Sequence, residues 1–140
     1  MSNWTHVAAV FRVDDIEANP QATLDEVFKR ECIWEGEFPR KVFADQRKHP
    51  EDYLPMGSEG SLHKSIWVNP DKSAMARYVV TIWGDLRDHD SIDEIGEWFT
   101  RCCKKLKWTC RQAVCTVRNE YLGEKVFTYE FGQYDQEDQE

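Results

Sequence analysis

The sequence predicts one α+β domain, an antiparallel sheet with two helices on one face. Three observations lead to this fold class. The chain has 140 residues, the usual size of a single domain. Its hydrophobic content of 41% supplies one core and argues against disorder throughout. Strand-like and helix-like patterns alternate along residues 1–133, which we take as the domain.

The first strand and the first helix follow one another closely. WTHVAAVFRV (4–13) alternates in part and ends at two aspartates, which predicts a strand. NPQATLDEVFKREC (19–32) predicts a helix, with Asn19 as its cap and Pro20 at its first position. Thr23 and Glu26 form an alternative capping box, so two starts about one turn apart remain open.

Residues 34–60 interrupt the pattern as a long loop insertion. Three prolines break any long element there, and two glycines loosen its end. Structureless loops of this length are uncommon in compact domains. We therefore expect the insertion to be functional, or to hold a short helix near 40–48.

The second half of the chain has clearer signals. SLHKSIWV (61–68) and AMARYVVTIWG (74–84) read as a hairpin around the turn NPDK. Residues 91–108 predict a helix, because Ser91 and Glu94 form a capping box before an apolar stripe. Segments 109–119 and 125–131 read as the last two strands. The order β-α-β-β-α-β-β is ferredoxin-like with one extra strand.

The stretch WGDLRDHDSIDE (83–94) raises the question of a metal site, since four possible ligands lie within six residues. Adjacent residues rarely converge on one ion, and the stretch lacks the glycine and ligand alternation of a calcium loop. Aspartates commonly satisfy backbone N–H groups in connections. We therefore interpret 85–90 as a strand-to-helix connection and predict no metal site; the four residues are Asp85, Asp88, His89 and Asp90.

No catalytic motif is present, so we predict no catalytic residue, no cofactor and no enzymatic activity. Nucleophilic catalysis needs a histidine beside a hydroxyl or thiol, and the predicted sheet order does not make His6 and His63 neighbours. The cysteine spacings fit no zinc pattern. We expect reduced and mostly buried thiols at Cys32, Cys102, Cys103, Cys110 and Cys115.

The uncovered face of the sheet is the first half of a candidate ligand site. Alternation places Trp67 on one strand and Arg77 and Trp83 on the next, all on the same face. Tryptophan and arginine on an open sheet form a platform on which a nucleobase can stack. The alternative is that this face packs against the long loop or a second subunit, and we expect a homo-oligomer.

The basic part of the insertion is the second half of that candidate site. FPRKVFADQRKH (38–49) carries Arg40, Lys41, Arg47 and Lys48 against one aspartate, and glycines and hydroxyls follow at 57–61. Together with the aromatic face, this cluster predicts binding of a small anionic ligand such as a nucleotide. The alternative is a solvated surface helix.

Charge restricts the remaining partners. The net charge is -8, and the final DQEDQE contributes -4, which leaves -4 for the rest. We expect residues 134–140 to form a disordered acidic tail. Phosphate backbones require a surplus of lysine and arginine, so general nucleic-acid binding is not expected. The N-terminus has no secretory pattern and no apolar run fits a membrane, so we expect a cytoplasmic protein.

The run SLHKSIWVNPDKSAMARYVVTIWGDLRDHDSIDEIGEWF, with the later RQAVCTVRNE, resembles small uncharacterised proteins encoded by bacteriophages. The resemblance covers about residues 61–119 and carries no site residues. It implies a protein acting in the host cytosol against host defences. Our first hypothesis is a non-enzymatic protein that sequesters a nucleotide signal. The alternatives are an inhibitor that binds a host protein through its acidic surface, and a small enzyme.

Overall fold

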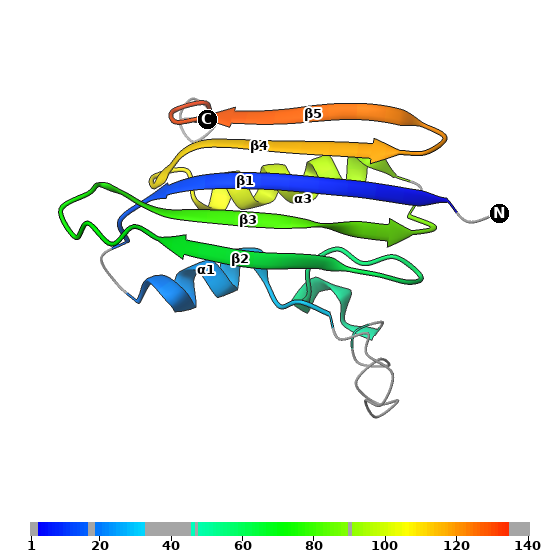
Figure 1. Cartoon of the computed structure of the whole chain (residues 1–140), viewed down its shortest axis with the longest axis horizontal. Helices are drawn as coiled ribbons and strands as arrows, with labels where there is room; N and C mark the ends of the chain where they lie inside the picture. The colour runs from blue at the N-terminus through cyan, green and yellow to red at the C-terminus, as the bar shows by residue number, and fades with distance from the viewer. Residues whose placement is uncertain (1–2, 17–18, 33–45, 47, 90, 135–140) are drawn as a thin grey trace.

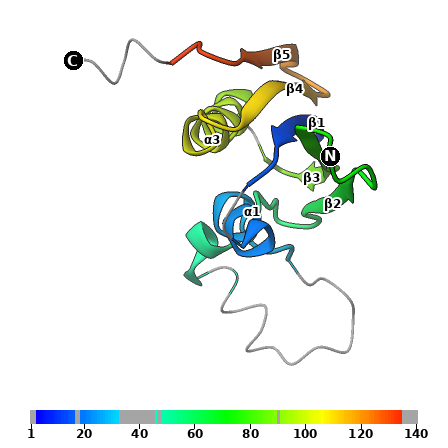
Figure 2. The ribbon, with the colours of Figure 1, turned by 90° about the vertical axis from the view of Figure 1, so that its left-hand side faces the viewer.

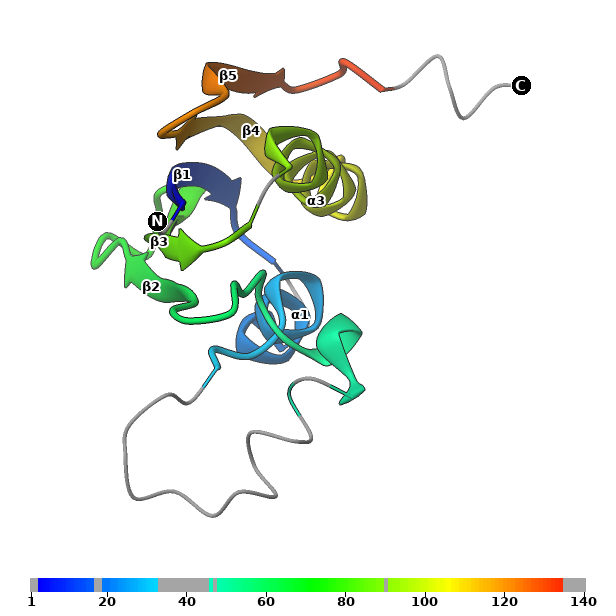
Figure 3. The same ribbon diagram turned by 90° about the vertical axis from the view of Figure 1, so that its right-hand side faces the viewer.

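The structure is a computed structural model that describes residues 3–16, 19–32, 46, 48–89 and 91–134. Its sheet contains five strands within these residues, in the order β2-β3-β1-β4-β5 (Figure 1). All four neighbouring pairs are antiparallel. The two helices lie on one side of the sheet (Figures 2 and 3). The predicted α+β class, antiparallel sheet and pair of helices are therefore confirmed.

The elements follow the predicted order with shifted ends. The strands are β1 (Trp4–Asp14), β2 (Leu62–Val68), β3 (Ala76–Arg87), β4 (Cys110–Asn119) and β5 (Gly123–Glu130), and the helices are α1 (Pro20–Phe28) and α3 (Ile92–Lys105). A short 3-10 helix, η1 (Pro50–Asp52), lies in the insertion. Most of the expected helix at 40–48 lies outside the described residues.

Local capping explains where both helices begin. The Asn19 side chain accepts a hydrogen bond from the backbone N–H of Ala22 at 3.3 Å, so the first of the two possible starts of α1 is the one used. Ser91 Oγ accepts from the backbone N–H of Glu94 at 3.1 Å, which confirms the predicted cap of α3. The helix α1 ends early, at Phe28, because Lys29 adopts a positive φ of 70°.

The core lies between the sheet and the helices. Phe11 of β1 is its centre, with the rings of Phe28, Phe99 and Trp98 at 4.8, 5.3 and 6.2 Å. Alternate residues of β1 are buried, from Val7 to Val13, because side chains of a strand point to opposite faces in turn. The remaining side chains of that strand therefore emerge on a face that no described helix covers.

Within the described residues, no helix is long and apolar enough to cross a membrane.

Candidate functional site

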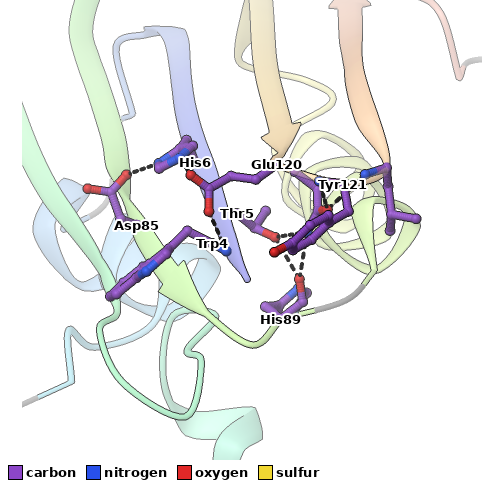
Figure 4. A network of polar contacts seen from close by, with 9 residues as sticks. Trp4, Thr5, His6, Asp85, His89, Glu120 and Tyr121 are labelled. Atoms are coloured by element: carbon purple, nitrogen blue, oxygen red, sulfur yellow. Dashed lines mark hydrogen bonds and ion pairs between the residues drawn. The ribbon is translucent and has the colours of Figure 1, made fainter. Parts of the chain in front are cut away.

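A histidine held between two carboxylates lies at one end of the open face. His6 Nδ1 is 2.6 Å from Asp85 Oδ1, and His6 Nε2 is 3.6 Å from Glu120 Oε2. The three side chains are 45%, 63% and 45% exposed. Figure 4 shows them converging from three different segments. The array is open to a molecule in solution.

The position of Asp85 follows from strand β3, which runs further than its sequence suggests. Backbone pairing of β1 with β3 continues to Trp4 and Arg87, and it sets Asp85 directly opposite His6. Opposite residues of an antiparallel pair have their Cβ atoms roughly 5 Å apart on the same face. The prediction that Asp85 lies in a connection is therefore wrong.

Glu120 approaches from the residue that follows β4. Its Oε1 accepts a hydrogen bond at 3.1 Å from the backbone N–H of Trp4, which anchors the carboxylate over the start of β1. The backbone N–H of Glu120 donates in turn to the carbonyl of Trp4 at 3.2 Å. This exchange fixes the other carboxylate oxygen near His6.

The two carboxylates raise the pKa of His6 above its ordinary value. The hydrogen bond to Asp85 is the largest cause; burial acts in the opposite direction, and the Asp85 and Glu120 charges add to the rise. We assign the Nδ1 proton to the bond with Asp85, because a carboxylate only accepts. The Nε2 atom then faces the Glu120 carboxylate at 3.6 Å.

A buried layer beneath the array holds the three segments together. Thr5 Oγ1 donates to the carbonyl of His89 at 2.6 Å (Figure 4). Asn119 Nδ2 donates to Thr5 Oγ1 at 2.9 Å. Thr5 and Asn119 are both buried. These bonds join β1, the end of β4 and the connection before α3, so the positions of His6 and Glu120 are supported from below.

The two tryptophans of the predicted aromatic platform lie on the same face as His6. Trp67 and Trp83 are 55% and 41% exposed, and the ring of His63 lies 5.8 Å from that of Trp83. Trp83 and Asp85 are adjacent residues on this face of β3. Trp67 lies opposite Val79, which is four residues from Trp83, so the two tryptophans are roughly 13 Å apart along the strands. One small ring can therefore stack on either tryptophan but not on both.

Arg77 is held away from the two tryptophans, and most of the basic loop lies outside the described residues. Arg77 Nη1 donates at 2.7 Å to the carbonyl of Asp71, so the guanidinium is tied to the hairpin turn. Lys48 is exposed. Arg40, Lys41 and Arg47 lie outside the described residues, so their role in anion binding stays a prediction.

The prediction that the cysteines are mostly buried is confirmed. All five cysteines are buried and unpaired. Burial raises the pKa of Cys32 to about 11 and those of Cys102 and Cys115 to about 12. The pKa of Cys103 is raised through its hydrogen bond with Cys110 and through burial, and Cys110 has no exposed surface. No cysteine thiol is therefore placed to attack a substrate.

The stretch 83–94 does not gather its acidic residues around one point. Asp85 binds His6, Asp88 accepts from the backbone N–H of Asn3 at 3.3 Å, and His89 Nε2 lies 3.3 Å from Glu94. Asp90 lies outside the described residues. A different group, His49, Glu51 and Asp52, has ligand atoms within 4.8 Å of one another, but all three residues are exposed.

A second concave region lies on the helix side. It is a half-open cavity of about 730 Å³ between α1, α3 and residues 50–56. Buried side chains such as Trp98 and Leu54 form its floor, and charges of both signs form its rim. Among the described residues that line the cavity, one buried side-chain atom has no hydrogen-bond partner, and it is Nδ1 of His89.

Sequence analysis considered His6 and Asp85 separately and assigned neither to a site, and it missed Glu120. The available signal was indirect. The histidine stands at an exposed position of the alternating first strand, and the predicted sheet order makes the first and third strands neighbours. Register decides the contact, and His6 and Asp85 are 79 residues apart.

Comparison with known proteins gives little further information. No protein-family model matches the chain, and no curated protein matches it. One solved structure that matches is a phage SAM lyase in complex with S-methyl-5′-thioadenosine, with 10% identity and a TM-score of 0.41. The match covers 93% of this chain and 92% of the other.

This match corrects one expectation. We expected no enzymatic activity, and the matching protein is an enzyme, so that expectation is withdrawn. The match is also to a phage protein, as the sequence resemblance was. A likeness this remote assigns neither origin, substrate nor chemistry to this chain.

Proposed function

We propose that the open face of the sheet binds a small molecule with a planar ring, and that His6 transfers a proton to or from that molecule. The observation that carries the proposal is the exposed His6 imidazole between Asp85 and Glu120, beside an exposed tryptophan. The same proposal includes a ferredoxin-like fold family, for which the strand order β2-β3-β1-β4 is the supporting feature, with β5 added beside β4.

Spacing supports a ligand of nucleoside size. Trp83 and Asp85 are neighbours on one face of β3, roughly 7 Å apart. A nucleobase stacked on Trp83 therefore brings its sugar to His6. Stacking on an aromatic side chain contributes about 1–3 kcal/mol per base.

Charge supports a neutral or weakly charged ligand over a polyphosphate. Arg118 of β4 lies directly opposite His6 in the sheet register. Protonated His6 and Arg118 together balance the charges of Asp85 and Glu120. An array with this balance has no surplus of positive charge with which to hold several phosphates.

The absence of a suitable nucleophile limits the chemistry. Within the described residues, the side chains bonded to His6 are carboxylates, and neither a hydroxyl nor a thiol is activated by it. Proton transfer in an elimination or isomerisation fits this arrangement, with His6 as base or acid and no covalent intermediate.

The binding test is calorimetric titration with adenosine, S-methyl-5′-thioadenosine, adenosine monophosphate, a cyclic nucleotide and adenosine triphosphate. Trp83→Ala should weaken any binding at least tenfold, through loss of the stack. Trp108→Ala is the matched control, because Trp108 is 67% exposed and lies past the end of α3. Failure of every compound to bind at 1 mM, or equal binding by Trp83→Ala, would overturn the binding proposal.

The catalytic test is mass spectrometry of the bound compound after incubation with the protein. His6→Gln should keep binding and lower turnover by about 10²–10⁴, the usual contribution of a general acid or base. A ligand that binds but is recovered unchanged rules out the proton-transfer step for that ligand and leaves a binding protein.

A further inference from the structure

The open face has an uncharged centre. Two rows of opposite residues cross all five strands there without an aspartate, glutamate, lysine or arginine. One row is Ser65, Thr81, Val10, Val114 and Thr128; the other is His63, Trp83, Ala8, Thr116 and Val126. Val10 and Val114 are only half-buried although they lie mid-sheet. Five of the ten residues in the two rows are apolar and none is an aspartate, glutamate, lysine or arginine, and depletion of charged residues is typical of the core of a protein interface.

Charged residues border this centre at both ends. The row beyond one end contains Asp85, His6, Arg118 and Glu124, and the row beyond the other contains Arg12 and Glu130. A polar rim around a centre depleted of charged residues is the usual anatomy of a protein–protein contact. The same face thus has both parts of an interface.

The size of the face matches a stable contact. Five strands about 4.8 Å apart, over eight residues of about 3.4 Å each, give a flat area of roughly 650 Å². Side-chain relief increases the accessible area above this value. A standard interface buries about 800 Å² on each partner. The face is therefore large enough for a dimer without help from other surfaces.

We propose that a second copy of this chain covers the open face, packed sheet against sheet around a two-fold axis along β1. This goes beyond the ligand proposal. The second copy would cover Trp83 and His6, so it and a base stacked on Trp83 compete for the same face. An axis along the central strand sets β3 of one copy over β4 of the other, and β2 over β5. Aligned packing of two sheets about 10 Å apart is a common arrangement.

Charge complementarity favours this occupant. Around that axis Asp85 of each copy faces Arg118 of the other, so one contact is made twice. Within the described residues, Arg118 has no ion pair inside its own chain, although it is exposed on this face. An arginine is long enough to cross the gap between sheets to a short aspartate. On the axis itself, Arg12 faces Arg12 at one end and His6 faces His6 at the other, which are the like-charge contacts of this arrangement.

The test is native mass spectrometry and light scattering of the ligand-free protein over a range of concentrations. The unmodified chain should be a dimer. Asp85→Arg and Arg118→Asp should each raise the dissociation constant at least tenfold, because each places like charges together. The double variant Asp85→Arg/Arg118→Asp restores opposite charges across the axis and should restore the dimer.

Three further variants keep the result independent of folding. Val10→Lys should abolish the dimer by placing two charges at its centre, whereas Val10→Thr keeps the size of the side chain and should not. Arg12→Ala removes one like-charge contact and should leave the dimer as strong or stronger. Circular dichroism should be unchanged in each variant.

A monomer at all concentrations up to 1 mM overturns the proposal. So does a dimer that ignores both Asp85→Arg and Val10→Lys, since the contact then lies elsewhere. Mass is measured without ligand, so failure here leaves the nucleoside-binding proposal standing, and failure of that proposal leaves the dimer.

Discussion

The two faces of the sheet are built from the same strands and do different things. The face toward the helices buries Phe11, Val80 and Ile82 completely. The opposite face exposes the side chains between them, including Trp83 and the His6 array. Each strand therefore contributes to stability on one side and keeps its chemical groups on the other. A substitution one residue away along a strand should change which property is lost.

The largest contrast is expected at Phe11 and its neighbour Val10. Phe11→Ala should lower the free energy of unfolding by about 3–5 kcal/mol, because it leaves a cavity among three aromatic rings. Val10→Ala, on the open face, should cost about 1 kcal/mol or less in the monomer. Urea denaturation at a concentration that keeps both proteins monomeric checks this. Equal losses would show that the open face is covered within the monomer.

The next effect concerns the contact of α3 with β5. A Cβ at Gly96 would lie 2.5 Å from the ring of Phe127. Gly96→Ala should therefore destabilise the protein by about 1–2 kcal/mol, with overpacking outweighing the gain of up to 1 kcal/mol in helix propensity. In the Phe127→Ala background, the same change should be neutral or stabilising. A clear stabilisation in the unmodified chain would mean that the ring moves aside without cost.

A smaller effect is expected at the start of α3. Ser91→Ala should cost about 1 kcal/mol in thermal or urea denaturation, the usual value of an N-cap. Asp88→Asn, three residues earlier and outside the His6 array, should leave ligand binding unchanged. A metal bound in a one-to-one ratio and lost in Asp88→Asn would contradict the interpretation of 88–90 as a connection without a metal site.

The smallest effect on stability belongs to the open face. Because the pKa of folded His6 is raised above its ordinary value of 6.5, His6 stabilises the fold most below that pH. That contribution disappears as pH rises through the folded pKa. The side chain is 45% exposed, so the change in stability should be slight.

The pKa itself is the sharper observable. Nuclear magnetic resonance titration of His6 should give a value above 6.5, which falls in Asp85→Asn and falls less in Glu120→Gln. Asp85 provides the main hydrogen bond, whereas Glu120 is further away at 3.6 Å. An equal fall in both variants would show that the two carboxylates hold the imidazole equally.

Several elements could be predicted from local signals because their causes are local. Asn19 and Ser91 mark helix starts through bonds to backbone groups three residues away. The ends of the elements were less well predicted. Strand β3 continues to Arg87 because β1 pairs with it that far, which the residues DLR do not indicate. Tyr134, expected in the acidic tail, instead stacks on Tyr129 at 5.3 Å.

In the ligand site, too, features with local causes could be predicted and features set by strand pairing could not. Alternation along a strand correctly placed Trp67 and Trp83 on one exposed face, because side-chain direction depends only on residue parity. It could not place His6 against Asp85 and Glu120, because that contact depends on the register of three segments. The proposed contribution of the basic loop remains a prediction, since most of its charged residues lie outside the described part of the chain.

The sequence by itself determined the fold class, the order of its elements, the capped helix starts and the burial of the cysteines. Each of these depends on hydrophobic periodicity or on bonds between residues a few positions apart. Only the tertiary structure decided which side chains share a site. Residues 6, 85 and 120 meet because backbone hydrogen bonds fix the register of β1 against β3 and β4, and that register is set by the packing of the whole sheet.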